Sequence, residues 1–179
     1  MHIILVGLPG CGKSTVGRQL GRRLDLPFVD SDTVIEQRAG MPISDFFEQF
    51  GEDRFRDLEE AVIDELTQGP PGVLATGGGT VLRPATRERL RARGTVVYLR
   101  SHPERLIARL RRDTKRPLLQ VADPLARLKE LQRQRDPLYK EVAGYVIDVQ
   151  STSLSMLVNR VLMQLELQPA HGAPARDDA

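Results

Sequence analysis

The stretch Gly7-Leu8-Pro9-Gly10-Cys11-Gly12-Lys13-Ser14 decides the fold, because it is a complete G-x-x-x-x-G-K-[ST] phosphate-binding loop. A short apolar run of strand type occupies residues 2–6 directly before it, and residues 14–24 after it carry apolar side chains at helical spacing. Strand, glycine-rich loop and helix in this order form the setting in which the pattern acts as a P-loop. The sequence therefore predicts a binding site for a nucleoside triphosphate near the start of the chain.

The P-loop also predicts the chemistry of that site. Its glycines allow backbone N–H groups to curl around a phosphate, and the following helix points its positive dipole end at the same place. Lys13 is expected to reach the β- and γ-phosphates, and the Ser14 hydroxyl to ligate Mg²⁺. The predicted nucleotide-binding residues of the loop are Gly10, Cys11, Gly12, Lys13, Ser14 and Thr15.

The composition narrows the class of protein. A chain of 179 residues with 40% apolar and 28% charged residues is typical of one globular domain with a substantial core. The net charge of +2 gives no reason to expect a nucleic-acid partner, and no apolar run approaches the length of a membrane span. No secretory signal is visible, and a single cysteine, Cys11, excludes an internal disulfide. We therefore expect a cytoplasmic protein that acts on small molecules.

Four further strands are predicted, at residues 27–30, 73–76, 96–99 and 145–149, with helical segments between them. Five strands separated by helices indicate a three-layer α/β sandwich with a mainly parallel sheet. In such a fold ligands bind at the carboxyl ends of the strands. The phosphate loop, the acidic residues after the second strand and the glycine run 77–79 after the third all follow strand ends. The polar segment 169–179 is predicted to be a disordered tail.

Two acids follow the second strand. Asp30 could hold Mg²⁺ through its water shell beside Ser14. Asp32 could project toward the acceptor hydroxyl, orient it and accept its proton. The same segment is equally compatible with an N-cap of the next helix, made by Ser31 or by Asp32. Spacing alone leaves both interpretations open.

A larger set of motifs resembles one family. It comprises the P-loop, Asp30-Ser31-Asp32, Phe55-Arg56 with Glu59, Thr76-Gly77-Gly78-Gly79, Arg116-Pro117-Leu118-Leu119, and Arg135 before Pro137-Leu138-Tyr139. In this order and spacing the motifs resemble the shikimate kinase family over residues 1–167. The resemblance implies a P-loop NTPase fold with strand order 2-3-1-4-5, ATP and Mg²⁺, and phosphorylation of the 3-hydroxyl of shikimate. It further implies a single domain over 1–168, with a substrate-binding segment at about 31–60 and a lid at about 109–123, acting as a monomer.

The resemblance also implies roles for residues of the acceptor site. Asp32 corresponds to the acid that holds the shikimate hydroxyls and serves as base, and Asp30 to the acid near Mg²⁺. Arg56 and Arg135 correspond to a pair that grips the substrate carboxylate. In the glycine run of Gly77, Gly78 and Gly79, the second glycine corresponds to one whose backbone N–H contacts the substrate. A planar arginine fork suits a carboxylate, although an isolated arginine on a helix is otherwise expected to be solvated.

On the nucleotide side, Lys13 and Arg116 are the implied catalytic cations. Arg116 corresponds to a lid arginine that closes over the transferring phosphate. Arg109 corresponds to an arginine that lies against the adenine ring, and Thr152 falls in the loop that borders this ring.

Other functions fit the sequence less well. Adenylate kinases carry an Asp-Gly-Phe-Pro-Arg type segment where this chain has Thr-Gly-Gly-Gly-Thr at 76–80, and a GTPase needs an Asn-Lys-x-Asp motif that the sequence lacks. Gluconate kinase is similar in size and substrate chemistry and stays as the alternative, although the motif set argues against it. The arginine-rich stretch 100–116 lacks the interleaved aromatic residues of a nucleic-acid-binding surface.

Overall fold

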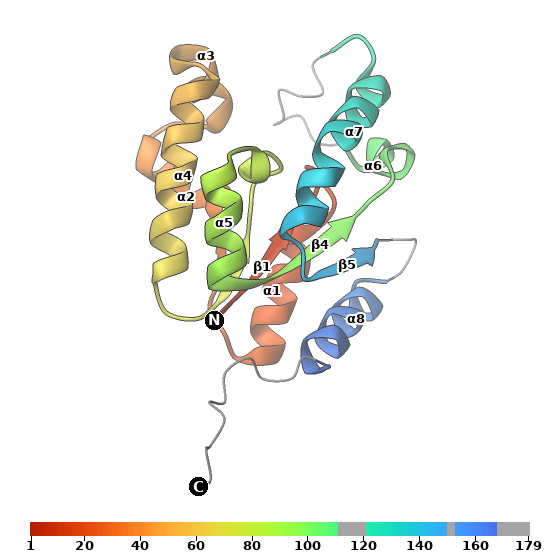
Figure 1. Cartoon of the computed structure of the whole chain (residues 1–179). Helices are drawn as coiled ribbons and strands as arrows, with labels where there is room; N and C mark the ends of the chain where they lie inside the picture. Colours follow the sequence, from red (N-terminus) through yellow and green to blue (C-terminus); the bar gives the residue numbers. More distant parts are fainter. Residues whose placement is uncertain (111–120, 150–152, 168–179) are drawn as a thin grey trace, which may run out of the picture.

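The computed structural model describes residues 1–110, 121–149 and 153–167. Its centre is a five-stranded, all-parallel sheet of order β2-β3-β1-β4-β5 (Figure 1). The strands are β1 (His2–Val6), β2 (Phe28–Asp30), β3 (Val73–Ala75), β4 (Gly94–Arg100) and β5 (Tyr145–Asp148). The predicted fold class and strand order 2-3-1-4-5 are thereby confirmed.

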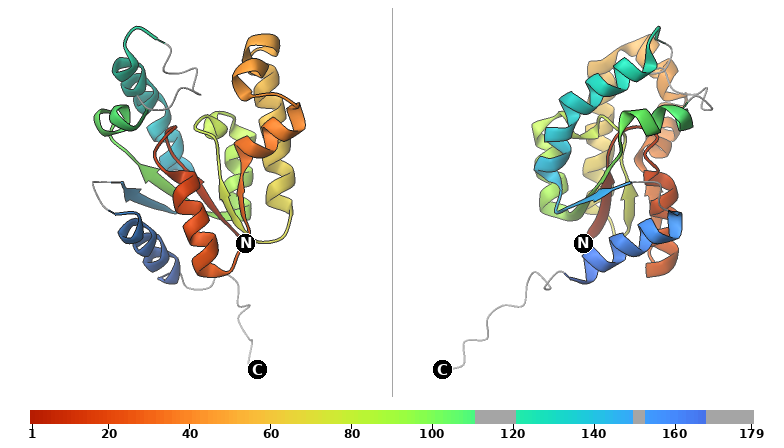
Figure 2. Two further views of the ribbon diagram at one scale, coloured as in Figure 1. Left: turned by 180° about the vertical axis from the view of Figure 1, so that it is seen from behind. Right: turned by 90° about the vertical axis from the view of Figure 1, so that its right-hand side faces the viewer.

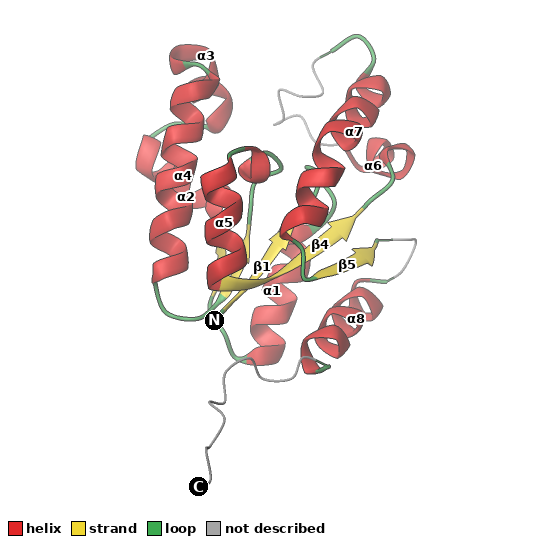
Figure 3. Cartoon of the chain, viewed as in Figure 1, coloured by secondary structure: helices red, strands yellow, loops and turns green. Residues whose placement is uncertain are grey.

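Helices cover both faces of the sheet, which completes the three layers (Figures 2 and 3). α1 and α8 pack side by side on one face, whereas α5 and α7 lie on the other, with α4 beside α5. No helix in the described ranges is both long and apolar enough to cross a membrane. The helices are α1 (Lys13–Leu24), α2 (Ser31–Ala39), α3 (Ile43–Phe50), α4 (Glu52–Gln68), α5 (Pro84–Arg93), α6 (Pro103–Leu110), α7 (Pro124–Val142) and α8 (Leu154–Glu166).

The central strands are apolar on both faces because helices cover both. Ile4, Leu5 and Val6 of β1 have no exposed surface, and Val97 and Leu99 of β4 are equally buried. The sequence of a parallel strand that is buried on both faces is a continuous apolar run rather than an alternation of apolar and polar residues. This rigid core holds the strand ends, and therefore the loops that follow them, in fixed positions.

A second, smaller core joins α2, α3 and α4 at the end of the molecule beyond β2. Ile35, Phe55 and Val62 are buried there, and Phe46 and Phe47 of α3 pack against them. The rings of Phe47 and Phe55 lie 4.5 Å apart between centroids. Packing of this kind fixes the orientation of α4 relative to α2, and both helices carry predicted site residues.

Two details of the helices differ from what the sequence pattern predicts. Ser44 is a candidate N-cap for a helix over residues 45–50, but α3 begins at Ile43 with Pro42 in the cap position. The pattern also predicts a helix from 124 that is interrupted or kinked near Pro137, whereas α7 runs through this proline without interruption. The helix predicted to end near Gly94 does so, since α5 ends at Arg93 and Gly94 pairs with His2 as the first residue of β4.

Candidate active site

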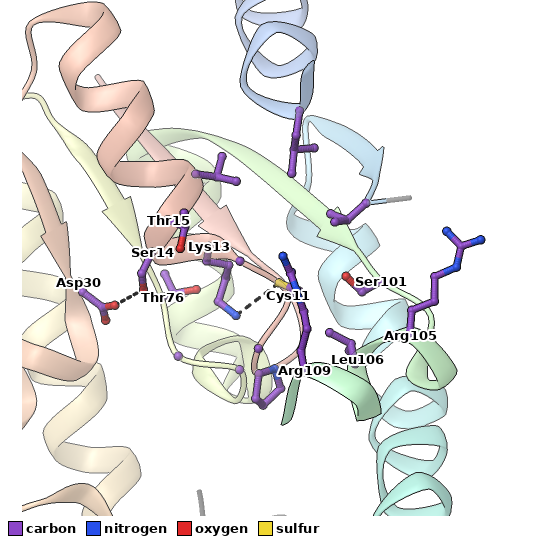
Figure 4. Close-up of a pocket in the computed structure, with 18 of the residues that line it drawn as sticks. Cys11, Lys13, Ser14, Thr15, Asp30, Thr76, Ser101, Arg105, Leu106 and Arg109 are labelled. Atoms are coloured by element: carbon purple, nitrogen blue, oxygen red, sulfur yellow. Dashed lines mark hydrogen bonds between the residues drawn. The ribbon is translucent and has the colours of Figure 1, made fainter. Parts of the chain in front are cut away.

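The parallel register brings the predicted functional segments to one edge of the sheet. Leu5 of β1 and Asp30 of β2 are both aligned with Ala75 of β3, so the three strands end together. The P-loop, the acids of α2 and the glycine run therefore converge there. A cavity of about 800 Å³ opens between them and α6, lined by residues 9–16, 30, 32 and 76–78 and, opposite, by residues of α6 and α8 (Figure 4).

The P-loop is wound as its motif requires. Gly10 and Gly12 have φ angles of 79° and 98°, a left-handed conformation that side chains rarely adopt, and Gly12 stands at the N-terminus of α1. The Lys13 ammonium donates hydrogen bonds to the carbonyls of Gly7 at 2.8 Å and Leu8 at 2.9 Å, and the residue as a whole is 8% exposed. The loop therefore holds its own cation at the mouth of the predicted phosphate site.

Asp30 joins the P-loop to α2 (Figure 4). One carboxylate oxygen accepts a short hydrogen bond from the Ser14 hydroxyl, and the other accepts one from the backbone N–H of Asp32 at 3.0 Å. Asp30 is therefore the N-cap of α2, and the expectation that Ser31 or Asp32 would cap this helix is wrong. The physical reason is that the second strand ends at Asp30, one residue before the helix begins. The Asp32 carboxylate is thus not needed to cap the helix.

Each glycine of the run 77–79 faces a group from a different element. A methyl group on the α-carbon of Gly77 would lie 2.8 Å from a carboxylate oxygen of Asp32, and one on Gly78 would lie 2.7 Å from the ring of Pro9. A methyl group on Gly79 would overlap the guanidinium of Arg56. A side chain at any of the three positions would require its neighbour to move, so the glycines allow these groups to approach the backbone closely. Residues of α2, the P-loop and α4 therefore all contact the glycine run.

Arg56 is held in place from several sides. Its Nη1 donates to the carboxylate of Glu59 at 2.8 Å, and its guanidinium lies 5.1 Å from the ring centre of Phe55. Glu59 is 3% exposed and also accepts a hydrogen bond from the Thr80 hydroxyl at 2.9 Å. Nε of Arg56 is buried and has no hydrogen-bond partner in the described part of the chain. The described residues therefore leave one N–H of this guanidinium available to a ligand.

Glu59 belongs to the motif set, but the sequence assigns it no role in the site. An acid three residues after an arginine lies on the same side of a helix, so the spacing alone predicts that Glu59 can pair with Arg56. Only the structure places this side of α4 against Thr80 and the glycine run, where Glu59 holds the guanidinium of Arg56 in position.

Burial distinguishes the two predicted carboxylate-binding arginines from their neighbours in sequence. Arg135 of α7 is 7% exposed, whereas the side chain of Arg133 is 73% exposed and pairs with Glu130. Arg54 is likewise exposed, in contrast to Arg56. Neither Arg56 nor Arg135 lines the cavity of about 800 Å³. Arg56 lies instead against the glycine run, outside the walls of this cavity.

The remaining predicted residues belong to the nucleotide side. Arg109 of α6 lines the cavity, and its Nη1 would lie 3.6 Å from a methyl group on Gly12 (Figure 4). Thr15 also lines the cavity. Arg116, Thr152, most of the predicted lid and the predicted tail 169–179 lie outside the described residues.

The fold and this site together define a P-loop protein with a second, polar site beside its phosphate loop, the general plan of a small-molecule kinase. The sequence model of the family described as "Shikimate kinase" matches residues 9–166. A shikimate kinase of Paracidovorax citrulli is 60% identical over 170 residues, covering 93% of each chain, and one of Ralstonia nicotianae is 55% identical, covering 93% of this chain and 87% of that protein. The chain belongs to the shikimate kinase family.

Solved structures agree with this assignment. The structure of "Shikimate kinase from Acinetobacter baumannii in complex with shikimate" superposes with a TM-score of 0.89 at 44% identity, covering 92% of each chain. A gluconokinase of Sinorhizobium meliloti superposes with a TM-score of 0.54 at 19% identity, over 92% of this chain and 91% of that one, a likeness that concerns the fold alone. The solved structures therefore agree that the chain is a member of the shikimate kinase family, and they do not support the alternative of a gluconate kinase.

Proposed function

We propose that this enzyme transfers the γ-phosphoryl group of ATP to the 3-hydroxyl of shikimate. The observation that carries the proposal is the convergence on one glycine run of an acid, a phosphate loop and a partly buried arginine. Shikimate has hydroxyl groups that require an acceptor for their protons and a carboxylate that requires a cation. These needs match Asp32 and Arg56, and the phosphoryl donor lies beside them in the P-loop. The family membership of the chain supports the same reaction.

On the donor side, ATP is the phosphoryl donor of this family, and Mg²⁺ is part of the proposal. Ser14 and Asp30 offer hard oxygen ligands that already touch each other. Mg²⁺ takes few ligands from the protein and the rest from phosphates and water, so a pair of this kind suits it. Bound there, the ion would neutralise charge on the phosphates. Lys13 would bind the β- and γ-phosphates, exchanging loop carbonyls for phosphate oxygens, and Arg109 would lie against the adenine ring.

On the acceptor side, Asp32 would orient the 3-hydroxyl and take its proton as the phosphoryl group arrives. Arg56 and Arg135 would bind the substrate carboxylate, and N–H groups of the glycine run would bind the ring hydroxyls. Charge-assisted contacts of this kind are stronger than neutral hydrogen bonds and fix the substrate in one orientation.

The organisation of the chain completes the proposal. Residues 1–168 would form one kinase domain, in which segment 31–60 carries much of the acceptor site and segment 109–123 closes over the reactants. Arg116 would contact the transferring phosphate from this segment, and Thr152 would border the adenine. The family resemblance supports these assignments, as it does a monomeric enzyme, and the single buried cysteine, Cys11, is compatible with the cytoplasm.

The carboxylate pair gives the most direct test. We expect Arg56→Lys and Arg135→Lys each to weaken shikimate binding at least tenfold while sparing ATP, since truncating one partner of a desolvated charge pair costs roughly 2–5 kcal/mol. Lysine keeps the charge but lacks the planar fork. The measurement is the Michaelis constant for each substrate, with Arg54→Lys and Arg133→Lys as matched controls from exposed positions of the same two helices.

A second acceptor makes this test specific for the carboxylate. Shikimate with its carboxylate replaced by a neutral amide should be poor for the wild-type enzyme, but should lose much less from either mutation. The two acceptors and the variants form a double-mutant-type cycle. If the mutations weaken the binding of the acid and of the amide equally, neither arginine recognises the carboxylate.

The lid is tested by hydrogen exchange. We expect amides of segment 109–123 to exchange more slowly in the complex with nucleotide and shikimate than in the free enzyme, because closure excludes water from the reacting phosphate. Arg116→Ala should lower kcat more than it weakens shikimate binding. Equal protection in the two states would contradict a closing lid.

A further inference from the structure

A buried tyrosine connects α7 to the glycine run. The Tyr139 side chain has no exposed surface, and its hydroxyl donates a hydrogen bond of 2.5 Å to the carbonyl of Gly78. The two residues are 61 positions apart in sequence. The proposed reaction assigns Tyr139 no role, and a buried hydroxyl that bonds to the backbone of a substrate-binding loop calls for an explanation.

Tyr139 and Arg135 lie on the same side of α7, because they are four residues apart, just over one helical turn. Burial raises the pKa of Tyr139, and Arg135 acts in the opposite direction by charge and by hydrogen bonding. The net effect is upward, so the hydroxyl keeps its proton and remains a donor to Gly78. One phenol group is therefore adjacent both to an arginine of the acceptor site and to the glycine run.

The hydrogen bond restrains more than one atom. The peptide group is planar and trans, so holding the Gly78 carbonyl toward Tyr139 turns the N–H of Gly79 in the opposite direction, away from the tyrosine. The ring of Pro9 lies against the α-carbon of Gly78. The glycine run is thus restrained at Gly78 by the P-loop and by α7, while Arg56 lies against Gly79.

We propose that Tyr139 is a positioning residue for the phosphoryl acceptor: its hydroxyl orients the Gly78–Gly79 peptide and Arg135 together, so that both meet shikimate in one fixed geometry. This inference rests on the proposed acceptor site. Tyr139 does not touch the substrate in this arrangement and acts through the groups that do. Its loss should therefore affect the binding of shikimate and spare that of ATP.

The chain provides a matched control in Tyr98 of β4. Its ring is also fully buried and packs against that of Tyr139 at a tilt of 35°, with centroids 4.9 Å apart. Its hydroxyl, however, donates to Asp136 at 2.8 Å. Tyr98→Phe and Tyr139→Phe thus each remove one hydrogen-bonded hydroxyl from the same aromatic pair, but only the second releases Gly78.

The experiment compares wild type, Tyr139→Phe and Tyr98→Phe by steady-state kinetics and thermal unfolding, at a temperature below all three unfolding midpoints. We expect Tyr139→Phe to raise the Michaelis constant for shikimate by about three- to tenfold, the range of one net hydrogen bond, with that for ATP changed less than twofold. The rise in unfolding midpoint caused by saturating shikimate should shrink in the same variant. Tyr98→Phe should keep the wild-type Michaelis constants for shikimate and ATP. Saturating shikimate should also raise its unfolding midpoint as much as it raises that of the wild type.

Each outcome decides between alternatives. If both variants change the shikimate constant equally, or neither changes it, the hydroxyl of Tyr139 is only a part of the core and the inference is wrong. It is equally wrong if Tyr139→Phe fails to fold while Tyr98→Phe folds, because the hydroxyl then serves stability. A wild-type enzyme that does not phosphorylate shikimate would instead overturn the proposed function, which the wild-type assay tests by itself.

Discussion

Replacement of Lys13 by methionine is expected to lower kcat for shikimate phosphorylation by on the order of 10²-fold or more, the usual cost of removing a positioned charge from a site where charge develops. The Lys13 ammonium already lies at the mouth of the loop, bonded to the carbonyls of Gly7 and Leu8. Methionine keeps the aliphatic stem, so the fold should be retained. The measurement is the rate of ADP release with saturating shikimate, alongside thermal unfolding.

Lys129 provides the control for this experiment. It lies on α7 with its side chain 55% exposed, 3.5 Å from Glu104, and takes no part in the proposed reaction. Lys129→Met should therefore keep near-normal turnover, because exposed ion pairs contribute little to stability. A Lys13→Met enzyme with near-normal turnover would remove this lysine from the mechanism.

Asp32→Asn is expected to lower kcat by roughly 10²–10⁴-fold, the range for loss of a general base, with the affinity for ATP nearly unchanged. Asparagine keeps the shape of the side chain beside Gly77 but cannot accept the proton of the acceptor hydroxyl. The helix should not suffer, since α2 is capped by Asp30 and not by Asp32. Single-turnover rates and nucleotide titrations measure the two quantities separately.

Asp30→Asn is the matched control, because it makes the same chemical change two residues away. Asparagine is as good an N-cap as aspartate, so α2 keeps its start. We expect this variant to need more Mg²⁺ for half-maximal rate, with a smaller loss of kcat once Mg²⁺ is saturating. If Asp32→Asn lowers ATP affinity and Asp30→Asn abolishes turnover at saturating Mg²⁺, the roles of the two acids are reversed.

The sequence by itself predicted five strands of a mainly parallel sheet and the nucleotide loop, whereas the strand order came from the family resemblance. Strands and loop are encoded locally: an apolar run such as 2–6 is suited to a strand buried on both faces, and the glycine spacing of 7–14 between a strand and a helix is that of a phosphate loop. The residues of the acceptor site came from the family resemblance, because spacing left the role of Asp32 open and did not separate Arg56 from Arg54.

Only the tertiary structure decided which side chains meet. That Arg56 lies partly buried against Gly79 while Arg54 is exposed depends on how α4 packs on α2 and α3. That Asp30 and not Asp32 caps α2 depends on where β2 ends, and that Tyr139 bonds to Gly78 depends on the placement of α7. Such contacts join residues far apart in sequence. Their distances follow from packing across the whole fold, which local spacing does not encode.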